Sequence, residues 1–582
     1  MQVTDFFGTS KGIAERFLSS VVAIDDQLSF DLSNGVASHQ PTKDDMDEFD
    51  LETDESTSGL GVPESRASVE HQRTKPLDHN LNYQELSVAF AEHGINCSAF
   101  KPDARSGNIE NIAEKILKSA RAADITILDW QMDDSFQKED GTAESDGTLA
   151  IVSIKKILED DKIQRGRLRL IVLYTAEPDL TSIAEKIKLA LTSAGYTPQL
   201  NDQKIVFTDD ILKFCHIVLV RKEPEATKLT ERVIELFTGL TAGLLSNAAL
   251  SAIGELRSKT HHLLHTFNNQ LDPAYLSHVI GLLSSPKVRE KADEVAFDYA
   301  AELISEEFKS ILQVNSALKA SLAKEKIISW VDHVNSGNHT EFFEFNIGAK
   351  PTRKAGSQII KDLLNATQPR EIKAALTTEP ALITEERDVG RFFASNRIQI
   401  NLKDWTTDSH EQLSFIECKR RDGISLIDHP YEPNIKQGSI IKDHQDNYYI
   451  CLQPLCDSVR LSDDTVFIFL KAKVVTADRG FSHVIRTRDG NKIKLLLTPK
   501  ATNIYHFLLK PNPDSKTVKA SAAENEYIIE YKIQHLETLT YKNLYWIGEF
   551  KHSVAQSISN NVAASISRVG LDTNEWLRQS AN

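Results

Sequence analysis

Five side chains that could handle a phosphoryl group stand at the ends of short apolar runs in the first 225 residues. They are Asp25, Asp26, Asp129, Thr175 and Lys222, and they follow the runs 20–24, 125–128, 170–174 and 216–220. A carboxylate can attack phosphorus and form an acyl phosphate. Phosphoryl transfer otherwise depends on positioning and on neutralisation of charge. The pattern predicts a phosphoacceptor site if the fold brings these run ends together.

The elements around these residues predict that arrangement. Strand-like and helix-like stretches alternate through roughly the first 225 residues, which favours a doubly wound parallel α/β sheet. Ligands of such sheets bind beyond the carboxyl ends of the strands. Mg²⁺ prefers hard oxygen ligands, so we expect Asp25, Asp26 and Asp129 to hold it. Lys222 would pair with a phosphoryl oxygen and Thr175 would donate its hydroxyl to another.

The same residues resemble the receiver domains of two-component response regulators, over about residues 15–225. The motifs that carry the resemblance are Ile-Asp-Asp at 24–26, Leu-Asp-Trp-Gln-Met at 128–132, Asp-Gly at 146–147, Tyr-Thr-Ala-Glu at 174–177 and Lys-Glu-Pro at 222–224. The resemblance implies a flavodoxin-like fold. It also implies Asp129 as the phosphoacceptor, Asp25 and Asp26 as metal ligands, Thr175 as the switch hydroxyl and Lys222 as the phosphate partner.

The resemblance further implies Mg²⁺ as the cofactor and a histidine kinase or phosphotransfer protein as the phosphodonor. Four features depart from the family pattern. They are a long segment after the first strand, a long stretch at 133–145, Glu223 between Lys222 and Pro224, and Leu219 where an aromatic switch residue is common. The sequence therefore predicts phosphorylation at Asp129 more directly than it predicts how a signal leaves that site.

The expected secondary structure changes several times along the chain. We expect a receiver-like domain at 1–225 with a disordered acidic insertion at 29–80, because that segment is rich in Asp and Glu and lacks apolar periodicity. The further segments are a helical linker or interaction domain at 226–340, a connector at 341–390 to which the sequence assigns no structure, a β-rich output domain at 391–550 and a C-terminal helix at 551–582.

Composition excludes several classes of protein. The chain has 582 residues and a formal net charge of −16, which argues against nucleic acid as the main partner, although Lys419, Arg420 and Arg421 form a small basic run. No apolar run reaches the ~18 residues of a membrane span, and the N-terminus does not resemble a secretion signal. Five scattered cysteines suit a reducing compartment. We expect a soluble, cytoplasmic protein.

Three other groups of residues have types and spacings that bear on a site. The run 413–421 reads as an apolar strand with Glu417 and Lys419 on one face, the pattern of restriction-type Mg²⁺ nucleases, in which Asp404 or Asp408 would supply a further ligand. His261 and His265 have zinc-site spacing but lack the glutamate of a zinc protease. Cys418, Cys451 and Cys456 are too loosely spaced for a metal site and favour core cysteines.

The sequence thus predicts a phosphoacceptor regulator rather than a dedicated enzyme. Asp129 would be phosphorylated in a Mg²⁺-dependent reaction, and helical and β-rich modules would pass the signal to a protein effector. Receivers fused to long modules resemble those of bacterial stress and antiphage defence systems. The alternatives are a receiver-gated nuclease that uses Glu417 and Lys419, and a scaffold protein that is not phosphorylated.

Overall fold

The computed structural model divides the chain into two compact units, which are described separately. The structure describes residues 5–28, 81–103, 108–132, 136, 147–223, 225–284, 289, 292–347, 351–378, 381–383, 398–403, 409–426, 431–477, 480–523, 526–535 and 538–566. The insertion at 29–80, the stretch 133–135, Pro224, Asp404 and Asp408 lie outside these ranges. No helix in the described ranges has the length and apolar character needed to cross a bilayer.

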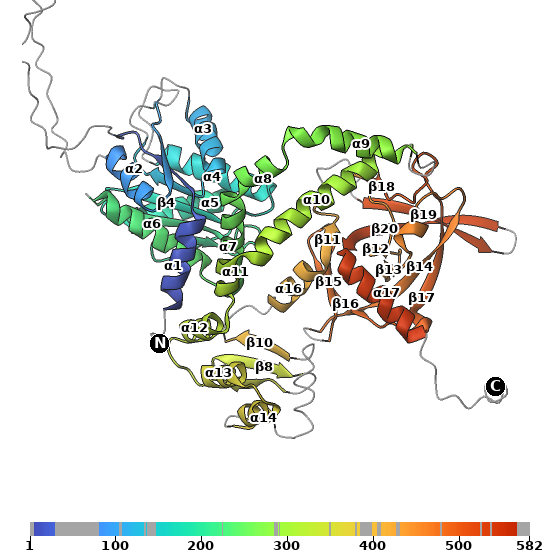
Figure 1. Cartoon of the computed structure of the whole chain (residues 1–582). Coiled ribbons are helices and arrows are strands. Elements are labelled where there is room, and N and C mark those ends of the chain that lie inside the picture. The colour runs from blue at the N-terminus through green and yellow to red at the C-terminus, as the bar shows by residue number, and fades with distance from the viewer. Residues whose placement is uncertain are drawn as a thin grey trace, which may run out of the picture. The chain divides into compact units, whose positions relative to one another are not determined.

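Unit 1, which comprises residues 1–279 and 293–334, contains the predicted α/β sheet (Figure 1). The strand order is β2-β1-β3-β4-β7-β6-β5. The strands are β1 Ser20–Ile24, β2 Asn96–Phe100, β3 Ile125–Asp129, β4 Arg169–Thr175, β5 Pro198–Asn201, β6 Lys204–Phe207 and β7 Cys215–Arg221. The first five in spatial order pair in parallel. This confirms the predicted doubly wound sheet.

Helices cover both faces of this sheet because alternate strand residues point to opposite sides. On β1, Val22 and Ile24 join one apolar core, whereas Val21 and Ala23 join the other. The first core includes side chains of α3 Ile109–Ala122, α4 Thr148–Ile163 and α5 Leu180–Ser193. The second includes side chains of α1 Phe6–Phe17, α2 Tyr83–Glu92, α6 Ala226–Thr241 and α7 Leu244–Ser258. Two buried faces are what makes the strands almost uniformly apolar.

An antiparallel hairpin extends the sheet beyond β7. Strands β5 and β6 pair with each other, and β6 pairs with β7 in antiparallel orientation. Asp202 in the connecting turn has a φ of +56°, a conformation that Asp tolerates better than most residues. The sequence analysis predicted no strand in this region. Each strand has only four residues, too few for a clear period-2 pattern.

Gly147 at the start of α4 makes a close approach that leaves no room for a side chain. Its φ is +81°, and an added Cβ would lie 2.2 Å from the Trp130 ring. Gly94, after α2, has a similar φ of +73° but nothing within 4 Å of the same position. The two glycines therefore differ in packing and not in backbone strain.

We expect Gly147→Ala to lower the free energy of unfolding by about 2–4 kcal/mol and Gly94→Ala by only ~1 kcal/mol, because the first adds a steric clash of ~1–3 kcal/mol to the same backbone penalty. Chemical denaturation of both variants beside the wild type checks the prediction. Equal losses in the two variants would contradict the role of the Trp130 contact.

The rest of unit 1 is helical. After α7 the chain forms α8 Thr260–Thr266, α9 Asp272–Leu282, α10 Ala292–Val314, α11 Ser316–Ser321 and α12 Lys324–Val334. The end of α9 from Ile280 onward and the first residue of α10, Ala292, are assigned to unit 2. α1 packs against α6, α7 and α12. A buried hydrogen bond of 2.9 Å joins Asn247 to Ser10, and the Arg257 guanidinium lies over the Phe17 ring while pairing with Asp124. These contacts attach α7 to the α/β sheet as part of the same core.

Unit 2 contains a small sheet and a larger one. Three antiparallel strands, β8 Phe343–Ile347, β9 Arg353–Ala355 and β10 Ile398–Leu402, pair in the order β10-β8-β9. Helices α13 Ser357–Asn365 and α14 Pro369–Thr377 follow β9. In its described residues, the segment 341–390, to which the sequence assigned no structure, thus holds two strands and two helices. Strand β10, from the region predicted to be β-rich, pairs with β8.

The larger sheet has ten strands, all paired in antiparallel fashion. They are β11 Lys419–Asp422, β12 Ser439–Lys442, β13 Tyr448–Cys451, β14 Thr465–Val475, β15 His483–Arg486, β16 Lys492–Leu497, β17 Ile504–Leu509, β18 Ser521–Ala523, β19 Glu526–His535 and β20 Thr538–Phe550. Because β20 pairs with both β12 and β19, six of the strands close into a ring. The β-rich region predicted from the period-2 pattern is confirmed.

Aromatic rings fill the inside of this ring, and a helix covers part of its outside. Phe507 makes edge-to-face contacts with Tyr449, Phe469 and Tyr531. On the outer face, α17 His552–Ile566 buries Ile558 and Val562 against the sheet. The sequence predicts that this helix docks through an i, i+4 apolar stripe. Ile558 and Val562 of that stripe are buried, whereas Ile566 is 57% exposed.

The predicted strand at 413–421 is wrong in its first half. Residues Ser409–Cys418 form helix α16, and only Lys419 begins strand β11. Phe415 and Cys418 are the buried residues of the helix, and Glu417 is exposed. Phe415 and Cys418 are three residues apart and lie on the same side of the helix, whereas Leu413 and Ile416 are 51% and 55% exposed.

Candidate phosphoacceptor site

Parallel pairing brings the predicted strand ends to one edge of the sheet in unit 1. β1 and β3 are neighbours, with Ile24 opposite Leu128, so that Asp25 and Asp129 are the next residues on adjacent strands. On the other side of β3, Asp129 pairs with Tyr174, which directly precedes Thr175. Thr175 in turn pairs with Arg221 on β7, which directly precedes Lys222. The order of the strands thus assembles residues that are up to 197 positions apart in the chain.

Lys222 connects two buried carboxylates. Its Nζ donates to Asp25 Oδ2 and to Asp129 Oδ2, each at 2.8 Å. The side chains of these three residues are 6%, 2% and 5% exposed. Oxygen atoms of Asp25, Asp26 and Asp129 all lie within 4.8 Å of one another, and this is the one group of potential metal ligands that the described residues contain. Three hard oxygens at this spacing suit Mg²⁺.

Burial and an excess of negative charge shape the protonation of the site. Burial raises the pKa of Asp129 from 3.8 to about 7; Lys222 opposes that rise, and Asp25 adds to it. For Lys222, burial alone lowers the pKa, but Asp129 and Asp25 outweigh it, so that the pKa of the ammonium group is raised. A single ammonium faces at least two carboxylates. The site therefore retains negative charge that a divalent cation would neutralise.

Backbone amides and loop side chains hold the carboxylates in place. Gln27 N donates to Asp25 Oδ1 at 2.7 Å, and Gln131 N donates to Asp129 Oδ1 at 3.4 Å. The Gln131 side chain also donates to the Glu177 carboxylate. This bond joins the loop after β3 to the loop after β4. It places Gln131 and Glu177 beside the site, although the sequence analysis assigned no role to either.

Thr175 and Lys222 are fixed through their backbones. Thr175 is fully buried, its hydroxyl accepts from Glu177 N at 3.2 Å, and its carbonyl accepts from Lys222 N at 2.8 Å. The Tyr174 hydroxyl donates to the Glu223 carbonyl at 3.0 Å and accepts from Glu223 N at 2.8 Å. Tyr174 thus fastens the residue that follows Lys222, a contact that the sequence analysis missed.

The family comparison agrees with this geometry. Residues 17–218 match a family model described as a response receiver domain. This part of the chain is a receiver domain. Neither the curated proteins nor the solved structures with which the chain was compared gave a match. The match ends before Lys222, so the position of that residue rests on the hydrogen bonds to Asp25 and Asp129 and on the pairing of β7.

Leu219, which occupies the position of the common aromatic switch residue, lies inside the receiver domain. It is 1% exposed and belongs to the apolar core on the α3–α5 side of the sheet. Leu219 also lines the cleft beside β7, and an aliphatic side chain has no polar group with which to replace the hydrogen bonds of an aromatic switch residue such as tyrosine. The hydrogen bonds of Tyr174 to Glu223 and of Lys222 N to the Thr175 carbonyl connect β4 directly with the segment after β7.

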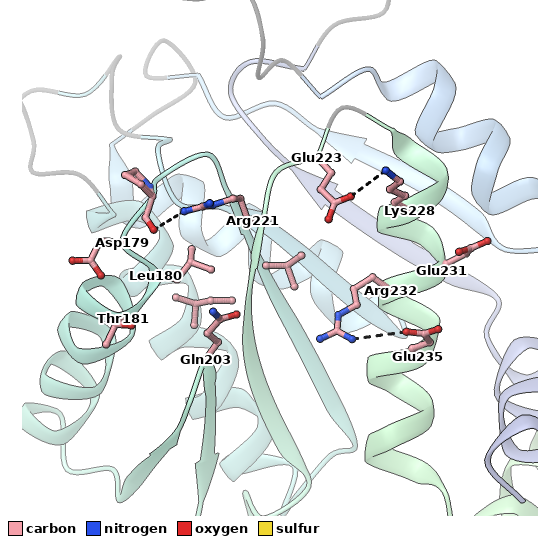
Figure 2. Close-up of a pocket in the computed structure, with 13 residues that line it drawn as sticks. Asp179, Leu180, Thr181, Gln203, Arg221, Glu223, Lys228, Glu231, Arg232 and Glu235 are labelled. Carbon is pink, nitrogen blue, oxygen red and sulfur yellow. Dashed lines mark hydrogen bonds and ion pairs between the residues drawn. The ribbon is translucent and has the colours of Figure 1, made fainter.

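A cleft of about 600 Å³ lies beside β7, on the far side of Lys222 from Asp129 in the order of the strands (Figure 2). Its wall includes Arg221 and Glu223, the two neighbours of Lys222, together with Gln203 of the hairpin turn. Arg221 donates to the Pro178 carbonyl at 2.7 Å. Glu223 faces Lys228 on α6 at 3.8 Å, as Figure 2 shows. The cleft thus borders the N-terminal end of α5 as well as α6.

The other predicted groups do not form sites in the described residues. His261, His262 and His265 are exposed on α8. Cys418 and Cys451 belong to different apolar cores, and Cys456 is exposed. Glu417 and Lys419 lie on different elements, and Lys419 pairs with Asp422 at 3.7 Å. The geometric basis for a Glu-x-Lys nuclease strand is therefore absent from this region.

Proposed function

We propose that the receiver domain accepts a phosphoryl group on Asp129 in a Mg²⁺-dependent reaction and acts as a response regulator. The observation that supports this most is the contact of Lys222 with both Asp25 and Asp129 at 2.8 Å, next to a third carboxylate, Asp26. A structural ion pair would need one carboxylate. Two buried carboxylates with a third beside them can bind a further positive charge in addition to the Lys222 ammonium.

The chemistry follows from the donor atoms. An Asp129 oxygen would attack the phosphorus of a phosphodonor and form an O–P bond, while the bond from phosphorus to the leaving group breaks and the leaving group departs with the electron pair. Lys222 would then pair with a phosphoryl oxygen in place of the Asp129 oxygen. The Thr175 hydroxyl, at the end of the adjacent strand, would donate to another.

Asp25, Asp26 and Asp129 would hold the metal ion. Bound Mg²⁺ would neutralise charge on the carboxylates and on the phosphoryl oxygens. The protein's own contribution is positional, because each of these carboxylates follows or ends a strand of a sheet with two buried faces. A histidine kinase or a phosphotransfer protein would supply the phosphoryl group in the cell.

Incubation of the full chain with a small acyl phosphate and Mg²⁺, followed by intact mass measurement, tests this proposal. We expect uptake of one base-labile phosphoryl group. A parallel titration with beryllofluoride, which mimics the phosphoryl group without a transfer step, covers a site that reacts only with its cognate donor. Failure of both would overturn the proposal and favour a scaffold role for the domain.

We expect the affinity for Mg²⁺ to fall as the solution becomes more acidic. The pKa of Asp129 is raised to about 7, so below that pH the ion must displace a proton. Affinity should therefore fall by up to about tenfold per pH unit below the pKa and level off above it. Titrations with Mg²⁺ at pH values from 3.8 to about 7, monitored by the fluorescence of Trp130 beside Asp129, measure how steeply the affinity depends on pH. Asp129→Asn should bind weakly with a flatter profile, and an equally steep profile would contradict the assignment.

The signal would leave the site through the segment after β7. Phosphorylation changes what Lys222 and Thr175 contact, and Tyr174 couples the backbone of Glu223 to β4. Movement there would alter the Glu223–Lys228 pair and the cleft between α5, β7 and α6. A protein effector, or the helical and β-rich parts of the chain, would respond to this change.

A further inference from the structure

Lys222 follows a part of β7 that has a strand neighbour on one side only, as far as the described residues show. β4 pairs with β7 up to Thr175 and Arg221. The β5–β6 hairpin reaches only Leu219, whose amide donates to the Gln203 carbonyl at 2.9 Å. Beyond that point, the hairpin side of β7 borders the cleft (Figure 2). The position of Lys222 therefore depends on contacts with β4 and with the surface of the cleft.

The contacts on the cleft side come from long side chains at the surface. The Arg221 guanidinium donates to the Pro178 carbonyl at 2.7 Å. Glu223 faces Lys228 at 3.8 Å, and both side chains are about half exposed. Exposed pairs of this kind contribute little to stability, and their rotatable bonds allow the contacts to persist while the backbone shifts. These contacts do not determine where Lys222 lies.

The contacts on the β4 side are short and involve the backbone. Lys222 N donates to the Thr175 carbonyl at 2.8 Å. One residue further on, Glu223 N donates to the Tyr174 hydroxyl at 2.8 Å, and this hydroxyl donates to the Glu223 carbonyl at 3.0 Å. Tyr174 is 2% exposed, and its ring belongs to the apolar core that includes α1 and α6. Because the core anchors the ring, the hydroxyl is a fixed point for the backbone that follows Lys222.

The Tyr174 hydroxyl also complements one departure from the receiver pattern. Glu223 stands between Lys222 and Pro224, and unlike a proline it has an amide hydrogen that requires an acceptor. The Tyr174 hydroxyl accepts that hydrogen and returns a bond to the carbonyl of the same residue. The additional residue after Lys222 and the tyrosine on β4 thus form a complementary pair.

We propose that Tyr174 is a positioning residue of the phosphoacceptor site: its hydroxyl fixes the backbone after Lys222 and thereby directs the ammonium to Asp25 and Asp129. The ammonium contacts each carboxylate at 2.8 Å, so a shift of this backbone would lengthen at least one of the two bonds. The inference rests on the proposed function, in which Lys222 pairs with a phosphoryl oxygen. It assigns the geometry of that lysine to a residue that is neither phosphoacceptor nor metal ligand.

Tyr174→Phe tests the proposal directly, because phenylalanine retains the ring and lacks the hydroxyl. The full chain is labelled with ¹⁵N in lysine, and the ammonium signal of Lys222 is identified by its absence from Lys222→Met. A buried ammonium held by two carboxylates should exchange its protons slowly with water in the wild type. In Tyr174→Phe we expect this exchange to be at least ~10-fold faster, since the site opens more often. The measurement requires no phosphorylation.

Titrations with beryllofluoride and with Mg²⁺ distinguish positioning from a general loosening of the domain. The affinity for beryllofluoride at saturating Mg²⁺ should fall by about tenfold in Tyr174→Phe, because the charge-assisted hydrogen bond from Lys222 is weakened. The affinity for Mg²⁺ should change by less than ~2-fold, because the hydroxyl bonds to Glu223 and not to the carboxylates that would hold the ion. Equal losses of both affinities would indicate general damage and overturn the proposal. If the wild type does not bind beryllofluoride, the proposed function fails and the ammonium exchange decides alone.

Tyr83→Phe is the matched control. Tyr83 lies on α2 of the same domain, and its hydroxyl donates to the Cys97 carbonyl at 2.8 Å. Its loss removes a tyrosine hydrogen bond far from Lys222, so the ammonium exchange and the beryllofluoride affinity should match those of the wild type. Unchanged ammonium exchange in Tyr174→Phe would overturn the proposal. The same acceleration in Tyr83→Phe would overturn it as well.

Discussion

Asp129→Asn should abolish covalent phosphorylation of this chain. The substitution keeps the shape of the side chain but replaces the nucleophilic carboxylate oxygen with an amide, which does not form an acyl phosphate. With a small acyl phosphate and Mg²⁺, the wild type should gain the mass of one phosphoryl group and the variant none. The expected loss is at least 100-fold in initial rate, since removal of a nucleophile leaves only adventitious reaction.

Asp202→Asn is the matched control for this experiment. Asp202 is exposed, and its φ of +56° is tolerated by Asn as well as by Asp, so the variant should be phosphorylated like the wild type. Base-labile phosphate in Asp129→Asn at the wild-type rate would place the acceptor elsewhere. Asp25 and Asp26 would then be the first residues to test.

Lys222→Met should destabilise the receiver domain by about 3–5 kcal/mol near neutral pH without divalent cations, the usual cost of removing one partner from a buried ion pair. Methionine retains the length and apolar packing of the lysine stem. It leaves Asp25 and Asp129 buried side by side without the ammonium that contacts both at 2.8 Å. Denaturant unfolding in the presence of a chelator measures the loss.

The pH dependence distinguishes charge from packing. Burial already raises the pKa of Asp129 from 3.8 to about 7, so the folded state binds more protons than the unfolded state within that window. Stability derived from this group is therefore present at low pH and lost as the pH rises through the window. The loss should be steeper in Lys222→Met, and acid or Mg²⁺ should restore part of it. A loss that neither condition reduces would indicate damage to packing.

Two further variants complete this test. Lys204→Met removes a lysine whose pKa is lowered by burial, and it should cost little or even stabilise the domain. Lys222→Met/Asp129→Asn removes the ammonium together with one carboxylate and should recover part of the stability. Recovery of less than ~1 kcal/mol would mean that the two residues are not energetically coupled.

Much of the receiver domain could be predicted because its signals are local. The apolar runs that end in Asp25, Asp129, Thr175 and Lys222 specify strands and place chemistry at their ends. Gly147 of the Asp-Gly motif directly precedes helix α4 and has a positive φ. The receiver-domain resemblance implied a flavodoxin-like, doubly wound sheet, and the parallel strands β2-β1-β3-β4-β7 form such a sheet.

The features that the sequence predicted wrongly or did not reveal have a different cause. The segment that contains Glu417 is helical: Cys418 joins an apolar core that only the folded chain provides, and Phe415, three residues earlier, is also buried. The hairpin β5–β6 has strands of four residues and depends on the free edge of β7. Neither feature has a periodic pattern long enough to decide between helix and strand.

By itself, the sequence determined which side chains stand at the strand ends, because short apolar runs specify where each strand begins and ends. Only the tertiary structure decided that Lys222 contacts both Asp25 and Asp129 and that Tyr174 holds Glu223. Those outcomes depend on which distant segments become neighbours. Spacing along the chain does not contain that information, because burial and partner choice are properties of the whole packed fold.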